Sequence, residues 1–334
     1  MMTVWALGII LLLVKLAVVL VGLLLLAAYL IYVERRLLGF FQLRLGPNRC
    51  GPQGLLQPLA DAVKLLMKED FVPEGADRRI FLYAPAVVAL VAFLIFAVVP
   101  FARGWTFRGQ PIPAVVVDLN VGLLFVLALS AIGVYGVALG GWASNSKYSL
   151  LGAIRGAAQM ISYEVPLALS LVPIVMLAGS FSLVDIVSAQ ARFPFILVQP
   201  LAFLIFFVSA VAEMKRIPFD IPEAENELVA GYHLEYSGMR FGLYFLGEYL
   251  TMVTLGALVA TFFLGGWRGP WLPPLLWFFL KVFLVVFVII WVRGTLPRLR
   301  YDQLMHFGWK VLIPLAMVNI VVTGGAMLAL GYRV

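Results

Sequence analysis

Eight long runs of apolar residues divide the chain, and shorter segments rich in polar and charged residues separate them. A helix needs about 20 apolar residues to cross the hydrocarbon core of a bilayer, and each run comes close to that length. The pattern therefore predicts an all-α integral membrane protein with eight transmembrane helices. The expected spans cover residues of about 4–33, 81–101, 119–143, 154–181, 194–212, 241–266, 270–292 and 311–332.

Basic residues are divided unequally between the two sets of connecting segments. Loops 34–79, 144–157, 214–240 and 293–310 hold 17 Lys and Arg residues, and the segments on the opposite side hold five. Because short cytoplasmic loops are enriched in Lys and Arg, we expect the first set in the cytoplasm and both termini on the outer side. Residues 1–334 are expected to form a single membrane domain.

Composition agrees with a bilayer environment and argues against several kinds of site. Hydrophobic residues make up 63% of the chain and charged residues 12%, against about 25% charged in a typical soluble domain. Despite the net charge of +7, no basic domain for nucleic acid is visible, because the basic residues are scattered between apolar runs. With Cys50 as the single cysteine and only His233 and His306 as histidines, no metal site is expected, and any electrons must travel on a partner.

The first predicted cytoplasmic loop contains a short amphipathic helix. Apolar side chains recur at helical spacing from Leu55 to Met67, while Gln57, Asp61 and Lys64 occupy the other face. The simpler interpretation is a cytoplasmic anchor that lies in the membrane interface. The alternative is a helix that roofs a cavity open to lipid, which would suit a ligand with an apolar tail and a polar head.

The third predicted cytoplasmic loop combines acids with apolar and aromatic residues. A run of charges usually marks a solvated loop, but Glu213 and Glu248 lie in the apolar runs on either side, and Glu164 lies at the mouth of another. Intramembrane carboxylates are costly and mark ion or proton paths. We therefore expect the loop to fold back into the protein, with its acids protonated or paired to Lys215 and Arg216. The acids within the loop are Asp220, Glu223, Glu225, Glu227 and Glu235.

Two lysines fall within predicted spans. Lys281 lies at the middle of the seventh, where a lysine should face the protein and meet a carboxylate or water. Its partner cannot be named from the sequence. Lys15, in the first span, is expected to make an inward polar contact.

Four blocks of sequence, in order along nearly the full chain, carry a resemblance to a known family. They are Glu34–Gly39 with Gln42–Arg49 and Gly54–Lys64; Gly141–Tyr148 with Gln159 and Ser162–Glu164; Arg216–Gly231 with Glu235–Gly238; and Pro297–Met305. The chain closely resembles the H subunit of the proton-pumping NADH–quinone oxidoreductase, respiratory complex I. In that family the subunit lies in the membrane at the junction with the peripheral arm.

The resemblance implies an eight-span core whose cytoplasmic loops dock the redox subunits and shape a quinone-access chamber. A quinone such as ubiquinone would enter from the bilayer and bind at the interface with the peripheral-arm subunits. The chain would then be a subunit of an H+-translocating NADH:quinone oxidoreductase of the bacterial cell inner membrane, with both termini periplasmic. It would hold no redox centre, because FMN and the iron–sulfur clusters belong to partner subunits. Small membrane subunits and lipid would be further partners.

Residue by residue, the resemblance implies two roles. The residues that would line or shape the quinone chamber are Arg35, Arg36, Arg44, Asp61, Arg216, Phe219 and Arg298. The residues that would form an acidic coupling path for protons are Glu164, Glu213, Glu223, Glu225, Glu227, Glu235 and Glu248, with Lys281 beside them. The chain departs from residues common in the family at Met214-Lys215 and at Leu296. These departures leave the charged positions intact.

Two other functions fit parts of the pattern. A homologous subunit of a membrane-bound hydrogenase, or of a ferredoxin- or deazaflavin-linked dehydrogenase, would share the fold. The intact first loop and the acidic third loop favour the quinone-type enzyme over it. A self-contained ion transporter would use the same buried acids, but such proteins often show two matching halves, and no internal repeat is visible. A transporter would also be active alone, whereas a complex I subunit would not.

Overall fold

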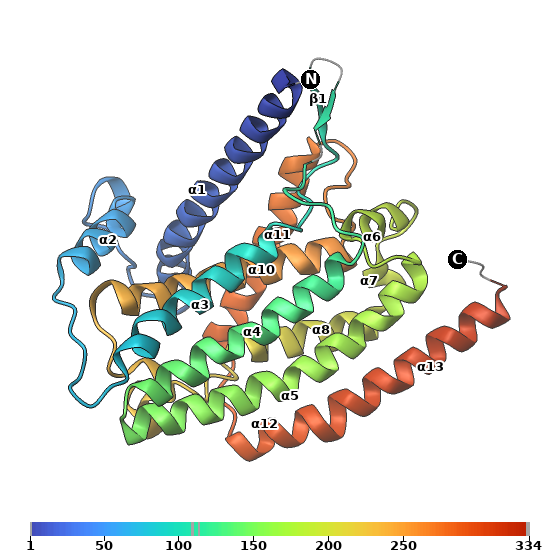
Figure 1. Ribbon diagram of the computed structural model, residues 1–334. Helices are drawn as coiled ribbons and strands as arrows, with labels where there is room; N and C mark the ends of the chain where they lie inside the picture. Colours follow the sequence, from blue (N-terminus) through green and yellow to red (C-terminus); the bar gives the residue numbers. More distant parts are fainter. Residues whose placement is uncertain (1, 108–109, 113, 332–334) are drawn as a thin grey trace.

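Helices make up most of the protein (Figure 1). A computed structural model describes residues 2–107, 110–112 and 114–331. It describes only the backbone of residues 2–11, 105–112 and 225–226. The long helices are α1 (Met2–Phe41), α3 (Arg78–Phe96), α4 (Gly122–Ala143), α5 (Lys147–Ala178), α10 (Gly238–Phe263), α11 (Pro274–Thr295) and α13 (Ile313–Ala329).

The remaining elements are short and lie in the connections between these helices. The short helices are η1 (Pro52–Gly54), α2 (Gln57–Met67), α6 (Leu183–Ala189), α7 (Phe195–Val198), α8 (Pro200–Glu213), α9 (Glu225–Leu228), η2 (Gly231–His233), α12 (Tyr301–Phe307) and the π-helical turn η3 (Gly308–Leu312). A small antiparallel hairpin pairs β1 (Trp105–Phe107) with β2 (Gln110–Ile112). The prediction of a helical membrane protein is confirmed, apart from this hairpin.

Seven helices in the described ranges are long and apolar enough to cross a membrane. The predicted fifth span, 194–212, instead forms two helices, α7 and α8, that meet at Gln199. Gln199 leaves the helical conformation (φ −129°, ψ 58°) because the next residue is Pro200, which disfavours helical geometry in the residue before it. The Gln199 side chain is held by α13, through Thr323 Oγ1 at 2.9 Å and Asn319 Nδ2 at 3.1 Å.

Some helices extend beyond the apolar runs that predicted them. Helix α1 continues to Phe41, so the Glu34-Arg35-Arg36 segment lies inside the helix rather than at its end. Leu23, Ala27, Leu30 and Glu34 are all buried and recur at helical spacing on one face. The last candidate span begins at Tyr301, before the apolar run at 311, because α12, η3 and α13 form one continuous helical stretch.

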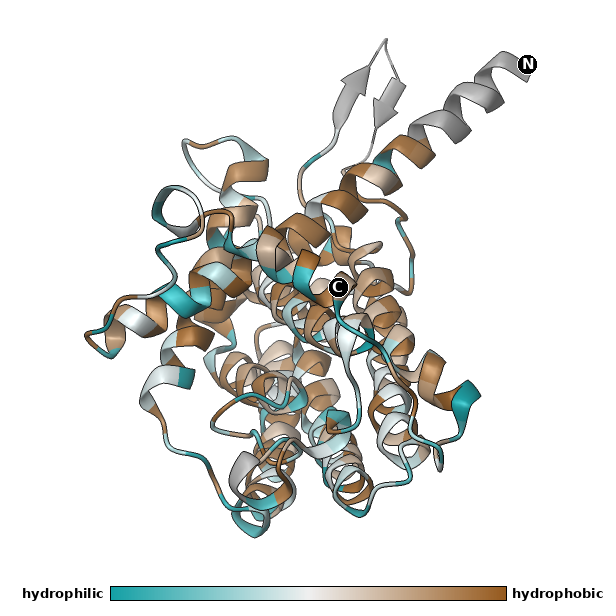
Figure 2. Ribbon diagram, turned by 90° about the vertical axis from the view of Figure 1, so that its left-hand side faces the viewer, coloured by the Kyte–Doolittle hydropathy of each residue, from teal (hydrophilic) through white to brown (hydrophobic). Residues whose placement is uncertain are grey.

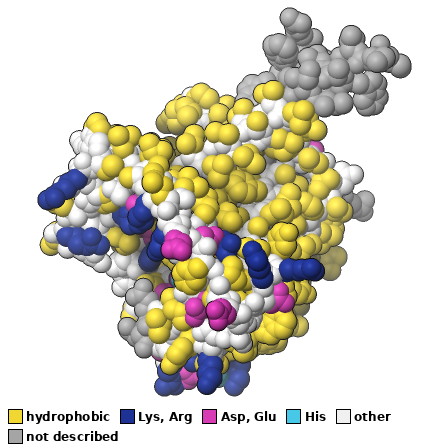
Figure 3. Space-filling model, turned by 60° about the vertical axis from the view of Figure 1, so that its left-hand side comes forward, with side chains coloured by type: hydrophobic (Ala, Val, Ile, Leu, Met, Phe, Trp, Pro, Cys, Tyr) yellow, Lys and Arg dark blue, Asp and Glu magenta, His cyan; other side chains and the backbone are white. Residues whose placement is uncertain are grey.

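Helix α10 lies at the centre of the bundle. It packs against α1, α3 and α11, and α3, α4 and α5 pack in sequence against one another (Figure 1). Hydrophobic residues extend along the helices, with hydrophilic segments in the connections (Figure 2). Apolar side chains also cover much of the surface, while charged side chains gather away from the N-terminal end (Figure 3). This distribution matches a protein whose flanks face lipid.

The predicted amphipathic helix of the first loop is confirmed as α2. It contacts α1 and α10 but stands to one side of the bundle (Figure 1). Its apolar residues Leu59, Leu66 and Met67 are 63%, 67% and 82% exposed. The apolar face of α2 is therefore open to lipid or to another subunit.

Candidate functional site

Arg216 is the centre of a buried ion-pair network that joins the third loop to three helices. Its Nη1 donates to both carboxylate oxygens of Glu34 in α1, at 2.6 and 2.7 Å. Its Nε lies 2.6 Å from Oε1 of Glu248 in α10, as an ion pair without hydrogen-bond alignment. The guanidinium also lies over the Tyr249 ring, 4.5 Å from its centre, and Arg293 of α11 contacts Glu34.

Burial and charge oppose each other at Arg216. Its side chain is only 3% exposed, and that of Glu34 is 2% exposed. Burial favours the neutral form, but the carboxylates of Glu248 and Glu34 outweigh it and hold the pKa of Arg216 well above its usual value. Because a paired charge in low dielectric is costly to separate, the network fixes the loop to α1, α10 and α11.

A tight turn after α8 aims two consecutive basic residues into the protein. Helix α8 ends at Glu213, and Lys215 adopts a positive φ of 58°, which non-glycine residues rarely occupy. The Gln159 side-chain amide donates to the carbonyls of Ala212 and Phe219, both at 2.7 Å, and so ties together the two ends of the turn. The turn leaves both Lys215 and Arg216 buried.

Lys215 begins a second set of polar contacts. Its Nζ donates to the Tyr232 hydroxyl at 3.1 Å and lies 4.4 Å from the centre of the Tyr232 ring. The Tyr232 hydroxyl in turn donates to Oε1 of Glu223 at 3.4 Å, and Nδ1 of His233 lies 3.9 Å from the same oxygen. An amine, a phenol, a carboxyl and an imidazole therefore meet within one loop.

The protonation states in this second set are far from those in water. Burial, with the carboxylates of Glu248 and Asp220 nearby, raises the pKa of Glu223 to about 8. Burial, with a smaller effect from Lys215, lowers the pKa of His233 to about 4. At neutral pH Glu223 is therefore mostly protonated and His233 is neutral, so their contact is not an ion pair. Burial also lowers the pKa of Lys215, although nearby acids oppose the shift. Groups poised in this way can exchange protons near neutral pH.

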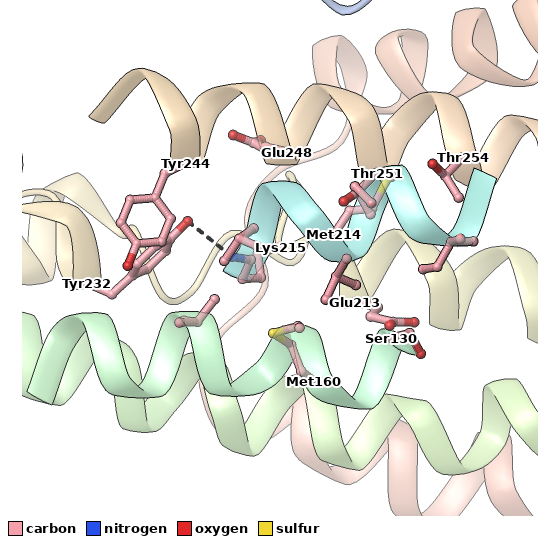
Figure 4. A pocket seen from close by; sticks show the side chains of 16 residues that line it. Ser130, Met160, Glu213, Met214, Lys215, Tyr232, Tyr244, Glu248, Thr251 and Thr254 are labelled. Atoms are coloured by element: carbon pink, nitrogen blue, oxygen red, sulfur yellow. Dashed lines mark hydrogen bonds between the residues drawn. The ribbon is translucent and has the colours of Figure 1, made fainter. Parts of the chain in front are cut away.

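Glu213 faces an internal cavity that reaches toward the loop (Figure 4). The cavity has a volume of about 70 Å³, enough for several water molecules. Its polar lining contains two acids, one base and hydroxyl groups, from α4, α8, α10 and η2: Ser130, Glu213, Lys215, Tyr232, Tyr244, Glu248, Thr251 and Thr254. Glu213 thus shares one hydratable space with Lys215 and Glu248.

A second, smaller cavity continues from Glu213 toward the apolar interior. It has a volume of about 50 Å³ and shares Glu213, Ser130 and Thr251 with the first. The Ser130 hydroxyl hydrogen-bonds Glu213, and Glu164 of α5 lies close enough to act on its charge. Glu213 therefore lies between the polar loop and the interior of the bundle.

Comparisons with known proteins agree with this arrangement. The family model described as NADH dehydrogenase matches residues 14–324. The second of the H subunits of NADH-quinone oxidoreductase in Syntrophobacter fumaroxidans is 67% identical over 98% of this chain and 99% of its own length. The first H subunit of Geobacter metallireducens is 64% identical over 97% and 98%, and the H subunit of Syntrophotalea carbinolica is 57% identical over 95% and 96%.

The chain belongs to the NADH dehydrogenase family. It is a subunit of an oxidoreductase complex, NADH-quinone oxidoreductase, and a multi-pass membrane protein. Other subunits of that complex are therefore its partners. Among the described residues, no group of three or more His, Cys, Asp or Glu is placed to hold a metal ion.

The residues that family resemblance assigns to a quinone chamber are distributed over three places. Arg35 pairs with Asp61 of α2 at 2.9 Å, and Arg36 donates to the carbonyl of Gln53 at 2.9 Å, so α1 holds the first loop. Arg44 is exposed and donates to its neighbour Gln42. These contacts form one group around the end of α1.

The other assigned chamber residues belong to the third loop. Arg216 lies in the buried network, and Phe219 packs near Tyr163 with ring centres 5.9 Å apart. Arg298 reaches the loop from beyond α11 and pairs with Asp220 at 2.9 Å. The third loop is thus held both from inside the bundle and from its rim.

The residues assigned to the acidic path are only partly brought together. Glu164, Glu213, Glu223 and Glu248 lie around the cavities and the buried loop, as described above. Glu227 is 59% exposed and pairs with Arg155 at 2.6 Å, and Glu235 is half-buried.

The side chain of Glu225 lies outside the described residues. Its backbone begins the short helix α9, so the alternating acids of the sequence lie on a helical turn.

Lys281 differs from expectation. It lies in the second turn of α11 rather than at mid-span, and its Nζ donates to three backbone carbonyls, of Leu264, Gly266 and Arg268, at 2.6, 2.9 and 2.7 Å. Carbonyls meet this lysine because the chain unwinds just after α10, which exposes acceptors that the helix no longer satisfies. The structure thus places Lys281 at the far end of α11 from Arg293.

Sequence reasoning missed Glu34 as a site residue. Glu34 is adjacent to the assigned arginines, but α1 is apolar on every side, so the sequence does not reveal which face is buried. Tyr232 and Arg293 were missed for a similar reason, since their roles depend on partners far away in the chain. The signal that would have found Glu34 is its spacing from Leu23, Ala27 and Leu30, residues of the same face.

Proposed function

We propose that this subunit forms the membrane side of a quinone-access chamber and couples quinone reduction to proton translocation through its buried acids. Quinone is the substrate, and FMN and iron–sulfur clusters on partner subunits supply its electrons. The proposal follows from the family, whose similar members are named as subunits of NADH-quinone oxidoreductases. Chamber roles are assigned to Arg35, Arg36, Arg44, Asp61, Arg216, Phe219 and Arg298.

One observation carries the coupling part of the proposal. Arg216 contacts Glu34 on α1, the helix that also holds Arg35 and Arg36, and it contacts Glu248 on the cavity wall. A negative charge that appears at a quinone near α1 would therefore compete with Glu34 and Glu248 for Arg216. Any change in that balance alters the field on Lys215, Glu223 and Glu213.

The proposed proton path follows from the same contacts. It begins at Glu223 and Tyr232, continues by Lys215 and Glu248 into the cavity, and reaches Glu213 and then Glu164. Waters in the cavity would bridge the gaps between these side chains. Their titrations would be coupled, so that apparent pKa values belong to the set rather than to one residue. Glu225, Glu227 and Glu235 are placed at the surface end of the path, and Lys281 has no proton role in it.

The proposed architecture has eight spans with both termini on the outer side. Helices α7 and α8 together cover residues 195–213, and at 1.5 Å per residue such a stretch is about 28 Å long, close to the bilayer core. In this arrangement α2 lies at the cytoplasmic interface and roofs the chamber. A reporter fused after Lys68 should then be cytoplasmic and one fused at Val334 external. Two reporters on the same side would overturn the eight-span arrangement.

The chamber role is tested by Asp61→Ala and Arg44→Ala in the assembled complex. Quinone reductase turnover should fall, while electron transfer from NADH to a water-soluble acceptor should persist, because that chemistry belongs to other subunits. The matched control is Asp302→Ala, which removes an exposed carboxylate whose partner is its near neighbour Arg300. Equal loss of both activities in fully assembled enzyme would contradict the chamber role.

A further inference from the structure

A large basic cavity opens at the end of the protein away from the proposed chamber. It has a volume of about 900 Å³. Its walls are the segment after α3, the loop between α6 and α7, the loop between α10 and α11, and the first turns of α11. The charged side chains in its lining are Arg103, Arg192, Arg268 and Lys281. Among the described lining residues none is acidic.

The basic side chains converge against the general trend of the molecule. Only five Lys and Arg residues fall in the segments expected outside the cytoplasm, and three of them, Arg103, Arg192 and Arg268, line this cavity. Like charges in one cavity repel one another, so their convergence costs free energy unless an anion is present. The grouping therefore favours a negatively charged ligand.

Lys281 adds charge to the cavity without offering a donor. Its three N–H groups are used by the carbonyls of Leu264, Gly266 and Arg268. Those carbonyls satisfy its hydrogen bonds but carry no formal charge. The ammonium therefore contributes a fixed positive charge to the wall.

Two donors in the lining are left without a partner. Nε of Arg268 and Nε1 of Trp277 are both buried, and neither has a hydrogen-bond acceptor among the described residues. Buried N–H groups nearly always find an acceptor. Arg268 uses one terminal nitrogen on the Ser188 carbonyl at 3.3 Å, which leaves its Nε for another acceptor. Both orphaned donors belong to residues of one cavity and await acceptor oxygens.

An apolar cavity adjoins the basic one. It has a volume of about 290 Å³, lies between α1 and α11, and is lined only by apolar residues and one glycine. The two cavities are neighbours in the chain at two points: Phe101 with Arg103, and Leu275 with Pro274. Beside them Trp271 is 92% exposed, and tryptophan is enriched where protein meets the interface of a membrane.

We propose that the basic cavity binds the phosphate headgroup of an anionic phospholipid, with an acyl chain entering the apolar cavity. The phosphate oxygens supply acceptors for Arg268 and Trp277, and the negative charge balances the four cations. A free phosphate ion would satisfy the same donors, but it would leave the adjoining apolar cavity unused. The lipid fits both cavities at once.

The test uses the assembled complex and a phosphatidylglycerol that carries a photoreactive group on one acyl chain. Crosslinking should map to residues 18–26, 96–101 or 275–279, the walls of the apolar cavity. Each basic residue near a membrane surface contributes about fivefold to binding of an anionic lipid, so Arg192→Gln with Arg268→Gln should lower the crosslink yield by about 25-fold. The matched control, Arg79→Gln with Lys310→Gln, removes two exposed charges elsewhere and should leave the yield unchanged.

Further outcomes decide the proposal. A phosphatidylcholine with the same label should crosslink far less, and millimolar inorganic phosphate should not displace the anionic lipid. Equal yields from the two lipids, or from the double variant and the control, would overturn the proposal. Displacement by inorganic phosphate would overturn the lipid assignment in favour of a soluble anion. A neighbouring subunit filling the cavity in a structure of the assembled complex would overturn it too.

Discussion

Arg216 and Glu34 are 182 positions apart in the chain, yet they share two hydrogen bonds of 2.6 and 2.7 Å with both side chains almost fully buried. The pair joins the third loop to α1, and through Arg293 it also joins α11. The same arginine contacts Glu248 beside the Glu213 cavity. This one residue connects the elements to which the proposal gives the chamber and the proton path.

The first prediction concerns the stability of this network. Arg216→Met should destabilise the subunit by about 3–5 kcal/mol, because it leaves two buried carboxylates without their partner. We expect a lower yield of assembled complex and a lower unfolding temperature. Adding Glu34→Gln should recover part of the loss, since it removes one of the unpaired charges.

The control for that prediction is the surface pair of Arg155 and Glu227. Arg155→Gln should cost at most about 1 kcal/mol, because both partners are exposed to solvent. A loss as large as that of Arg216→Met would show that burial does not set the cost.

The second prediction concerns pH. The pKa of Glu223 is raised to about 8, so between pH 4.5 and 8 the folded protein holds a proton that the unfolded chain has lost, and stability falls as pH rises. His233, with its pKa lowered to about 4, acts in the opposite sense only below pH 6.5. Between pH 6.5 and 8 the Glu223 contribution should therefore stand out.

Unfolding temperatures of the assembled complex at pH 6.5, 7, 7.5 and 8 provide the measurement. The wild type should lose stability across this range more steeply than Glu223→Gln. Lys215 opposes the trend, because burial lowers its pKa, but it is present in both proteins and its direct contribution is common to both. Parallel curves for the two proteins would refute the raised pKa of Glu223.

The membrane class, the amphipathic helix and the residues of the polar loop could all be predicted from the sequence. These features follow from local composition and spacing, which hold whatever the tertiary packing. The division of the fifth apolar run could also have been foreseen, because Pro200 follows Gln199 directly. Hydropathy averages over such a residue and so indicated one continuous span.

The partners of the charged residues could not be predicted in the same way. Glu34, Arg216 and Arg293 come from three distant parts of the chain, and an apolar helix does not show which face meets its neighbours. Lys281 was expected to meet a carboxylate or water, but it satisfies carbonyls exposed where α10 ends. Long-range pairing depends on how the helices cross, which no local pattern records.

The third prediction separates the buried from the exposed acids of the path. Glu227→Gln should reduce quinone-linked turnover only mildly, because Glu227 is 59% exposed and water can replace its function. Glu248→Gln should reduce it strongly, because Glu248 lines the cavity and pairs with Arg216. Turnover per assembled complex is the measurement, and a larger effect at Glu227 would reverse the proposed order.

The central claim is that Glu213 carries protons linked to quinone reduction. Glu213→Gln removes the titrating group with little change in volume, so assembly should survive. Quinone reduction and linked proton uptake should both fall by about 100-fold, the lower end of what a positioned proton-transfer group contributes. Glu213→Asp should be milder, because it keeps a carboxyl group at the cavity.

The most direct measurement reconstitutes the assembled Glu213→Gln complex in vesicles and records quinone reduction and proton uptake together. Glu69→Gln, which removes an exposed acid whose backbone carbonyl alone contacts the third loop, is the matched control and should behave as wild type. We predict a steep joint loss of both activities in Glu213→Gln. Wild-type rates with a wild-type ratio of protons to electrons would contradict the claim.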